Sequence, residues 1–364
     1  MRIAFHSPIK PPDHPVPSGD RLMARLLIRA LRLGGAEVDV VSEFRSFRRE
    51  PPRDGLAGLL DEAGREIERT AASWRRAGPP DLFFAYHPYY KAPDLIGPEL
   101  ARRFSIPYVT AESSYSSQRD AGGWAEMQAH VRAALEAAAV NICMTARDRE
   151  GLAANVALAR TAMLAPFIDA APYLAHPPRP EPGRLVTVAM MRPGDKLDSY
   201  RMLAAALATV DRPDWSLSVI GDGSARGEVE AMFSGFAPGR IVWHGELGEP
   251  AVASELAQGS LYVWPGCGEA YGLAYLEAQA AGLPVVAQAI AGVPSVVIGG
   301  RTGILTQAGD VEAFAAAIRR LLSSPDERLG LAANARGFAT GERSLAAASS
   351  RLVSIITEFA GVTV

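Results

Sequence analysis

The chain has 364 residues, a formal net charge of −3, and 48% hydrophobic against 21% charged residues. This is the composition of an ordinary globular protein, and the length suits two domains that each have a core of their own. The charge gives no reason to expect nucleic acid as a partner, and the sequence has no zinc-ligand spacing.

Three features bear on the compartment in which the protein acts. Residues 1–6 reach polar and proline-rich sequence too soon for a signal peptide. Residues 278–300 lack charged side chains and could span a bilayer by length, but glycine and proline interrupt them every few residues, so buried strand and turns is the better interpretation. Cys143 and Cys267 lie far apart, which argues against a disulfide framework. We therefore expect a cytoplasmic protein without a transmembrane segment.

The first half of the chain alternates apolar runs with stretches of helical periodicity. Residues 2–7 are predicted to form a strand, and a proline-rich loop then leads to a helix that ends at Gly34 and Gly35. With the next strand this is a Rossmann-like opening, although the fingerprint Gly-x-Gly-x-x-Gly is absent. Further predicted elements are strands at 37–41, 82–86, 107–110 and 140–144 and a helix at 124–139.

Polar side chains follow two of these strands. His87 comes directly after the strand at 82–86, and Glu112 follows the strand at 107–110. Because ligands of open α/β sheets bind outside the carboxyl ends of the strands, both side chains could face the same crevice. His87 could carry a proton or donate a hydrogen bond to a substrate, or it could be satisfied structurally within the fold.

A run of arginines lies between residues 44 and 55 and comprises Arg45, Arg48, Arg49 and Arg53. Such a charge run is usually a solvated loop, and we favour this interpretation because nothing amphipathic continues the run. The alternative is a patch for an anionic acceptor or for a lipid surface, which would allow peripheral association with the inner membrane surface.

The composition changes between residues 166 and 183, where prolines gather, and this stretch predicts a linker between two domains. The second domain opens with a strand at 185–189, followed by a loop and helix start that carry Arg192 and Lys196. Two cations there could hold a diphosphate and stabilise a departing charge without a metal, or they could be surface charge. Further strands are predicted at 217–220, 241–245, 261–264 and 284–287.

Two glutamates mark the segment that follows the strand at 261–264. Glu269 lies on the loop at the carboxyl end of that strand, and Glu277 lies about one turn into a helix that opens near Gly272 and stops at Gly282. Helix N-termini bind anions and carboxylates accept hydrogen bonds from hydroxyls, so a diphosphate, a ribose and a sugar would all suit these groups. The alternative is that Glu269 caps the helix and Glu277 is solvated.

This segment resembles the signature of retaining glycosyltransferases with the GT-B fold, the family 4-like "glycosyl transferases group 1". The matching residues are Glu269, Gly272-Leu273 and Glu277-Ala278-Gln279-Ala280-Ala281-Gly282-Leu283-Pro284-Val285-Val286. Gly292-Val293-Pro294 and residues 301–305 are similar to the continuation of the family pattern. The resemblance implies an α/β protein with two Rossmann-like domains facing each other across a crevice, and it is strongest from 186 to about 336.

The resemblance implies a sugar transfer from a nucleoside-diphosphate sugar, such as a UDP- or GDP-sugar, to a hydroxyl acceptor with retention at the anomeric carbon. It implies no metal and no cofactor, because the nucleotide sugar is a substrate. The acceptor could be a glycan, a lipid-linked compound or a small molecule. Two alternatives stay open: a non-catalytic nucleotide-sugar-binding module, and a GT-B epimerase that acts on the nucleotide sugar itself.

The resemblance also implies roles on the donor side. Arg192 and Lys196 would hold the diphosphate and stabilise the departing charge, Glu277 would bind the ribose hydroxyls, and Glu269 would fix the sugar. The backbone at the helix start would assist, through Ala270, Tyr271, Gly272 and Leu273. Gly245, which ends the strand at 241–245, would lie beside the nucleotide base.

On the acceptor side the family pattern is less complete. In the family, a glycine at the position of Gly19 lets its loop approach the substrates closely, whereas the alternative for Gly19 is turn geometry. Many members carry a histidine next to the transferred sugar where this chain has Glu112. Either Glu112 takes over a polar role towards sugar or acceptor, or the local alignment differs. His87 and Glu112 are the acceptor-side residues that we expect.

These observations predict four segments. Residues 1–165 would form the acceptor-side Rossmann-like domain, 166–183 the linker, and 184–342 the nucleotide-sugar-binding domain. The last segment, 343–364, would be a helix, and in GT-B proteins such a helix often crosses back to the first domain.

Overall fold

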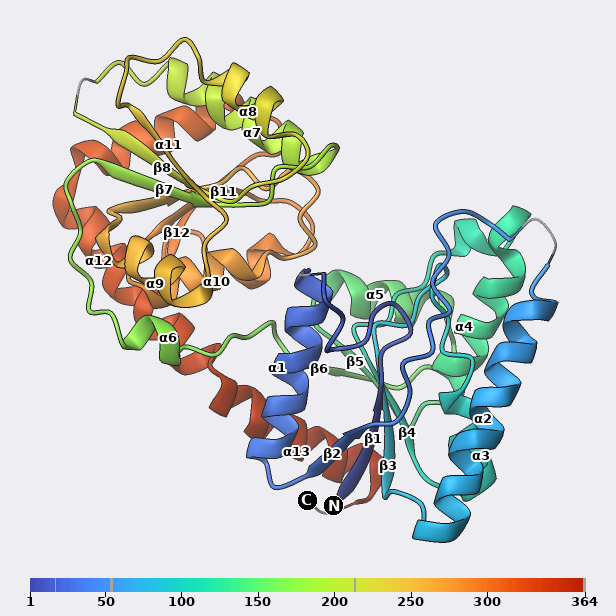
Figure 1. Ribbon diagram of the computed structural model, residues 1–364. Coiled ribbons are helices and arrows are strands. Elements are labelled where there is room, and N and C mark those ends of the chain that lie inside the picture. Colours follow the sequence, from blue (N-terminus) through green and yellow to red (C-terminus); the bar gives the residue numbers. More distant parts are fainter. Residues whose placement is uncertain (17, 53–54, 213, 363–364) are drawn as a thin grey trace. The chain divides into compact units, whose positions relative to one another are not determined.

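The structure is a computed structural model that describes residues 1–16, 18–52, 55–212 and 214–362. The chain divides into two compact units (Figure 1). The first unit comprises Met1–Ala165 and Leu345–Val364, and the second unit is the continuous segment Pro166–Ser344. No helix in the described part of the chain is long and apolar enough to cross a membrane.

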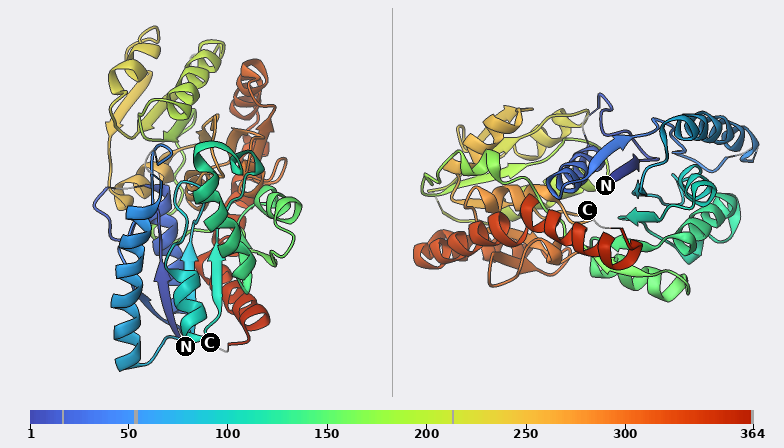
Figure 2. Two further views of the ribbon diagram at one scale, coloured as in Figure 1. Left: turned by 90° about the vertical axis from the view of Figure 1, so that its right-hand side faces the viewer. Right: turned by 90° about the horizontal axis from the view of Figure 1, so that it is seen from below.

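The first unit is built on a parallel sheet that has six strands in the described residues, in the order β2-β1-β3-β4-β5-β6. Both faces of the sheet are covered by helices (Figures 1 and 2), which explains why β3, β4 and β5 are buried along their whole length. The strands are β1 Arg2–His6, β2 Glu37–Val40, β3 Leu82–Tyr86, β4 Tyr108–Ala111, β5 Val140–Cys143 and β6 Thr161–Met163. The helices are α1 Gly19–Leu33, α2 Ala57–Ala77, α3 Gly97–Phe104, α4 Ala125–Ala137, α5 Ala146–Asn155 and α13 Leu345–Ala360.

Helix α13 belongs to the first unit although it follows the second unit in the sequence. It packs beside α1, where Gly34 leaves room for it: a Cβ at Gly34 would lie 2.6 Å from Cγ2 of Val353. Hydrogen bonds also tie α13 to the edge strand β6, because Nε of Arg351 donates to the carbonyl of Met163 at 3.1 Å. The closing helix therefore completes the first unit.

The second unit contains another parallel sheet, again six-stranded in the described residues, in the order β12-β11-β10-β7-β8-β9. Its strands are β7 Arg184–Val188, β8 Ser216–Ile220, β9 Ile241–Gly245, β10 Leu261–Val263, β11 Val285–Gln288 and β12 Gly303–Thr306. Its helices are α6 Ala171–Leu174, α7 Asp195–Ala208, α8 Arg226–Met232, α9 Glu249–Gln258, α10 Leu273–Ala280, α11 Val311–Ser323 and α12 Pro325–Gly337. The predicted strands and helices of both halves are present.

Residues 166–183, predicted as a linker, are part of the second unit. Helix α6 forms within them, and the amides of Arg179 and Glu181 donate to the carbonyls of Ala257 and Gln258 at 2.7 and 2.9 Å. Proline removes amide donors and fixes φ, but the remaining amides are free to pair. The high proline content therefore marks irregular backbone here, and not a detached connection.

The two places where the chain passes between the units lie next to each other. The amide of Ile168 donates to the carbonyl of Arg343 at 2.9 Å, and Ile168 forms a parallel bridge with Ser344.

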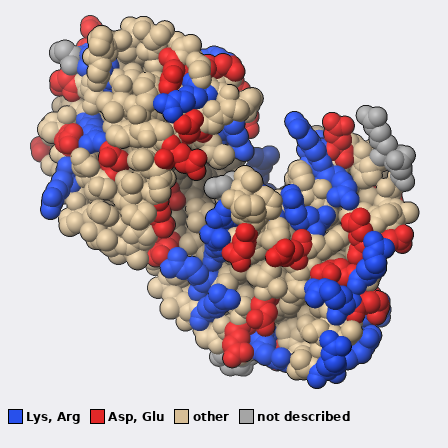
Figure 3. Space-filling model, viewed as in Figure 1, with Lys and Arg blue, Asp and Glu red and all other residues tan. Residues whose placement is uncertain are grey.

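On the outer surface, acidic and basic side chains are mixed (Figure 3). On the face shown, positive and negative side chains are interspersed and do not gather into two large areas of opposite charge.

Candidate functional site

The strand order of the second sheet reverses at β7, which pairs with β8 on one side and with β10 on the other. The connections that leave β7 and β10 therefore begin next to each other at the carboxyl edge of the sheet. This is the position at which open parallel sheets bind ligands. The first connection carries Arg192 and leads into α7, and the second carries Glu269 and leads into α10.

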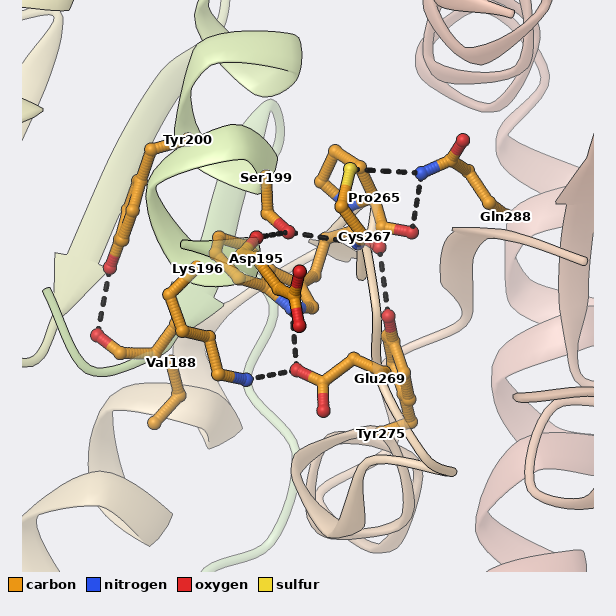
Figure 4. Close-up of polar contacts among 12 residues, drawn as sticks. Val188, Asp195, Lys196, Ser199, Tyr200, Pro265, Cys267, Glu269, Tyr275 and Gln288 are labelled. Atoms are coloured by element: carbon orange, nitrogen blue, oxygen red, sulfur yellow. Dashed lines mark hydrogen bonds and ion pairs between the residues drawn. The ribbon is translucent and has the colours of Figure 1, made fainter. Parts of the chain in front are cut away.

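At this edge Lys196 and Glu269, 73 positions apart in the sequence, form an ion pair through Nζ and Oε1 (Figure 4). Nε1 of Trp264 donates to the same carboxylate oxygen at 3.2 Å, and Nζ of Lys196 lies 5.6 Å from the centroid of the Trp264 ring. Both side chains of the pair are largely buried, with 19% and 16% exposed. Partial burial strengthens a charge pair because it removes screening water. Arg192 is exposed, and within the described residues it contacts neither member of the pair.

Glycines allow the loop from 265 to 272 to pass close to α7. Gly268 and Gly272 have φ of 71° and 78°, which side chains other than glycine rarely adopt. A Cβ at Gly268 would lie 2.3 Å from Cγ of Asp195, and one at Gly272 would lie 2.7 Å from the ring of Tyr275. The amide of Cys267 donates to Oγ of Ser199 at 2.8 Å (Figure 4). The loop is thus fastened to the first turns of α7.

The other predicted donor-binding residues occupy two places. Ala270 is exposed and its carbonyl accepts a hydrogen bond from the amide of Gly292 at 2.6 Å, whereas Tyr271 and Leu273 are buried at the start of α10. Gly245 ends β9 with φ of 69°, and its carbonyl accepts from the amide of Gly221 at 2.7 Å. Because β8 separates β9 from β7, Gly245 lies further along the same edge of the sheet.

Glu277 lies in α10 and is partly buried. Burial raises the pKa of Glu277 to about 7, the charge of Glu249 on α9 adds to the rise, and the nearby Tyr173 opposes it. Burial, followed by the charge of Glu277, raises the pKa of Tyr173. Sequence reasoning missed Tyr173, because it lies on α6 in the stretch predicted as a linker.

In the first unit His87 and Glu112 leave neighbouring strands side by side, since Tyr86 and Ala111 are paired in the sheet. Their φ values are 60° and 56°, a left-handed conformation that is uncommon for residues other than glycine. Nδ1 of His87 lies 3.2 Å from Oδ1 of Asp20, in the first turn of α1. The hydroxyl of Tyr86 donates to Oε2 of Glu112 at 2.9 Å.

The charges around His87 favour its protonated form. Burial alone would lower the pKa of His87, but the charge of Glu112 and the contact with Asp20 raise this pKa above the ordinary value of 6.5. The close contact with His87 in turn lowers the pKa of Asp20. Sequence reasoning missed Asp20; its position in the first turn of the helix after β1 was the available signal, because that turn faces the same edge of the sheet as the ends of β3 and β4.

Two other predictions for the first unit can be compared with the structure. Gly19 is the first residue of α1, does not have positive φ, and has no atom within 4 Å of an added Cβ. The turn-geometry interpretation of Gly19 is therefore wrong, whereas close approach of a substrate stays a prediction. In the arginine run, Nε of Arg45 donates to the carbonyl of Ile9 at 2.9 Å, and Arg53 lies outside the described residues.

Residues 182–324 match the family model described as Glycosyl transferases group 1. The matched segment lies in the second unit and contains Lys196, Glu269 and Glu277. This segment of the chain is similar to glycosyl transferases group 1. Tyr173 and the residues of the first unit lie outside the matched segment.

The curated proteins that this chain resembles include glycosyltransferases. D-inositol 3-phosphate glycosyltransferase from Streptomyces griseus subsp. griseus is 37% identical over 112 residues, which are 30% of this chain and 24% of that relative. The chain thus matches about a quarter of the length of that relative. A protein of the same name from Arthrobacter sp. (strain FB24) is 25% identical over 388 residues, covering 93% of this chain and 91% of the relative.

Solved structures share the fold of this chain. Sucrose-phosphate synthase from Thermosynechococcus elongatus superimposes with a TM-score of 0.75 and 20% identity, covering 98% of each chain. HepE from Anabaena in complex with UDP gives a TM-score of 0.74 and 16% identity, covering 98% of this chain and 100% of HepE. The predicted fold class, GT-B with two Rossmann-like domains, is confirmed.

Proposed function

We propose that the protein is a glycosyltransferase that moves a sugar from a nucleoside-diphosphate sugar to a hydroxyl acceptor, with retention at the anomeric carbon and without a metal. The observation that carries the proposal is the Lys196–Glu269 ion pair at the reversal point of the second sheet. A cation and a carboxylate that are held together beside two helix starts suit a substrate with both a diphosphate and hydroxyl groups.

In this proposal the second unit binds the donor. Lys196 and Arg192 contact the diphosphate, and Glu277 accepts hydrogen bonds from the ribose hydroxyls. Oε1 of Glu269 is occupied by Lys196 and Trp264, while Oε2 has no hydrogen bond among the described residues and is available to a sugar hydroxyl. The UDP complex of HepE supports a nucleotide-diphosphate ligand for this fold.

The proposed reaction breaks the bond between the anomeric carbon and the diphosphate oxygen. Negative charge develops on the departing diphosphate, where the Lys196 ammonium and the Arg192 guanidinium stabilise it. The acceptor hydroxyl attacks the same face of the sugar, and its proton passes to an oxygen of the leaving phosphate. The products are the glycosylated acceptor and a nucleoside diphosphate, with retained configuration.

The first unit would bind the acceptor. Asp20, His87 and Glu112 form a polar group at the carboxyl edge of its sheet, next to the reversal of strand order at β1. The protonated imidazole can donate a hydrogen bond to an acceptor hydroxyl, and Glu112 can accept one.

The first experiment is thermal unfolding of the wild type and of Glu277→Ala with UDP, GDP, ADP and dTDP and with their glucose conjugates. A ligand at about 100 times its dissociation constant adds about 2.7 kcal/mol to the stability of the folded state, which raises Tm by several degrees. We expect one nucleotide series to raise Tm of the wild type and not of the variant. No shift with any compound would contradict the donor site. Binding of a nucleotide sugar without transfer in an acceptor screen would favour a non-catalytic binding module. Conversion of the nucleotide sugar to another sugar in the absence of any acceptor would favour an epimerase.

A further inference from the structure

Two cations meet on the ring of Tyr90, in the connection that follows β3. Nζ of Lys91 lies 5.8 Å from the centroid of this ring, and Cζ of Arg119 lies 4.9 Å from it. Within the described residues neither cation forms an ion pair with a carboxylate, and Asp120, the acid next to Arg119 in the chain, is bound by Arg132 at 3.2 Å. Because the two like charges repel each other, an anion placed beside them would be attracted by both.

The fold holds this ring and its cations in place. The Tyr90 ring packs edge-to-face against Trp124, which is 7% exposed, with the two centroids 5.1 Å apart, and Nζ of Lys91 also lies 5.8 Å from the Trp124 ring. The carbonyl of Lys91 accepts a hydrogen bond from the amide of Arg48 at 2.8 Å, which brings a third basic residue to the same place. The three basic residues come from the connections β2–α2, β3–α3 and β4–α4, which all leave the carboxyl edge of the sheet.

The distribution of lysine in the sequence singles out the same place. Three of the 37 basic residues are lysines, namely Lys10, Lys91 and Lys196, and the others are arginines. Each lysine follows the carboxyl end of a strand, β1, β3 or β7, at the edge where parallel sheets bind ligands. Lys196 belongs to the candidate donor site, and Nζ of Lys10 donates to Oγ of Ser18 at 3.3 Å. Among the described residues Lys91 has neither a carboxylate nor a hydroxyl as its partner.

A line of aromatic rings connects the cluster to the acceptor-side residues. The His87 ring lies 5.4 Å from that of Tyr89, and the Tyr89 ring lies 5.3 Å from that of Tyr90, centroid to centroid. Asp20 and Glu112 make the surroundings of His87 acidic, which suits acceptor hydroxyls but repels an anion. A substrate that extends along these rings would therefore place hydroxyls at His87 and a negative group at Tyr90.

We propose that Tyr90, Lys91 and Arg119 form a subsite for a phosphate group on the hydroxyl acceptor. The inference rests on the proposed function and specifies the chemical class of its acceptor. A phosphate ester carries nearly two negative charges at neutral pH and has several acceptor oxygens, so it matches two cations better than a carboxylate does. The guanidinium of Arg119 can bind two phosphate oxygens at once, and the ammonium of Lys91 acts as a point charge. The phosphate can belong to a soluble sugar phosphate or to a lipid headgroup.

The small number of lysines makes a specific test possible. Reductive methylation with ¹³C-formaldehyde labels each lysine amine and keeps its charge, so NMR spectra contain a separate signal for Lys91, assigned with Lys91→Arg. The probes are glucose 6-phosphate and glucose, which differ only in the phosphate, and sodium chloride at matched ionic strength controls for screening. Glucose 6-phosphate should shift the Lys91 signal to saturation, whereas glucose and sodium chloride should leave it in place.

Two arginine variants show whether the phosphate is bound at the cluster. In Arg119→Gln the dissociation constant of glucose 6-phosphate, measured from the Lys91 signal, should rise about tenfold, because the phosphate loses a charge-assisted hydrogen bond. Arg76→Gln is the matched control. Arg76 is also an arginine of the first unit without an ion pair in the described residues, but it precedes β3 and so lies at the amino edge of the sheet. Its dissociation constant should equal that of the wild type.

Phosphatidylcholine vesicles with and without phosphatidic acid are the second arm of the experiment. A Lys91 signal that responds to glucose 6-phosphate supports a soluble phosphorylated acceptor, and one that responds only to vesicles with phosphatidic acid supports a lipid-borne phosphate.

A Lys91 signal that responds to neither phosphate would overturn the inference, as would an equal response to sodium chloride. A wild-type dissociation constant in Arg119→Gln would overturn it as well. The proposed function is tested separately through the Lys196 signal. If UDP-, GDP-, ADP- and dTDP-glucose all leave that signal unchanged, the donor site has failed, which is a different result from a failure at Lys91.

Discussion

Each of the two units has its own parallel sheet, six-stranded in the described residues, yet the two units present polar groups at the edges of their sheets in different ways. Both edges hold a charge pair, Lys196 with Glu269 in the second unit and His87 with Asp20 in the first, but in the loop of the second unit glycines adopt the unusual backbone angles. In the first unit His87 and Glu112 themselves adopt left-handed φ. Such conformations cost of order 1–3 kcal/mol each and persist only where the surrounding structure holds them.

The difference shows two ways of fixing a site. The loop of the second unit contains a contiguous glycine-rich sequence, so the loop itself specifies its path. The edge of the first unit depends on contacts between distant residues, such as His87 with Asp20 and Glu112 with Tyr86. Variants that remove a charge or change a backbone preference should therefore act differently in the two units.

The largest effect is expected for Lys196→Ala, which removes the buried cation of the pair. Transfer should fall by about 10²- to 10³-fold, because the departing charge loses its stabilisation, while Arg192→Ala should cost less since Arg192 is exposed. Steady-state kinetics with a known donor would measure both. Arg201→Ala, which removes an exposed cation from the same helix, is the matched control. Wild-type turnover in Lys196→Ala would refute the assignment of Lys196.

A pair of glycine substitutions tests the backbone part of the comparison. Gly268→Ala places a Cβ 2.3 Å from Cγ of Asp195 at a residue with φ of 71°, and should lower the free energy of unfolding by about 1–3 kcal/mol. Gly19→Ala meets open space at a helical residue and should change stability by about 0.5 kcal/mol or less. Urea denaturation of both variants gives the comparison. Equal changes in the free energy of unfolding of the two variants would mean that the backbone conformation at residue 268 does not require glycine.

His87→Gln removes the positive charge of the protonated imidazole from the first unit. The folded-state pKa of His87 lies above 6.5, so its pairing stabilises the protein fully below pH 6.5 and less as the pH rises through the folded-state pKa. Thermal unfolding from pH 5.5 to 9 should show a steeper decline in the wild type than in the variant, which keeps the pH-dependent contribution of Glu277. Transfer should fall about tenfold while nucleotide-sugar binding is retained. Loss of donor binding would instead place the defect in the second unit.

Glu277→Gln is expected to produce a gain in stability. The pKa of Glu277 is about 7 in the folded protein against 4.5 for an ordinary glutamate, so the wild type loses stability as the pH rises between these values. Glutamine does not ionise and is close to glutamate in size. The variant should unfold with about 1–2 kcal/mol more free energy above pH 7. A variant no more stable than the wild type at pH 8 would show that Glu277 ionises without cost.

The sequence was sufficient to predict the fold, for a physical reason. Strands buried on both faces are continuous apolar runs, such as residues 82–86, and the loop with Glu269 is local in sequence, so its spacing is visible directly. The pairing of Lys196 with Glu269 was not visible, because it depends on β7 and β10 being neighbours. Retention, metal independence and the compartment stay predictions.

Tyr173 and Asp20 could not be found in the same way. Tyr173 lies on a four-residue helix inside a proline-rich stretch, where composition indicates a linker and conceals the packing against α10. Asp20 reads as an ordinary acidic residue in the first turn of a helix, which the helix dipole alone would explain. In both cases the partner is far away in sequence, and only the tertiary fold makes the contact.

The path of the chain has a consequence for synthesis on the ribosome. The second unit is a continuous segment, whereas α13 of the first unit is made only after the whole second unit has been translated. Until then the face of α1 that receives α13, with Gly34 at its end, is without its cover. The second unit can therefore fold while α13 is still to be translated, whereas the first unit is completed only after α13 has left the ribosome.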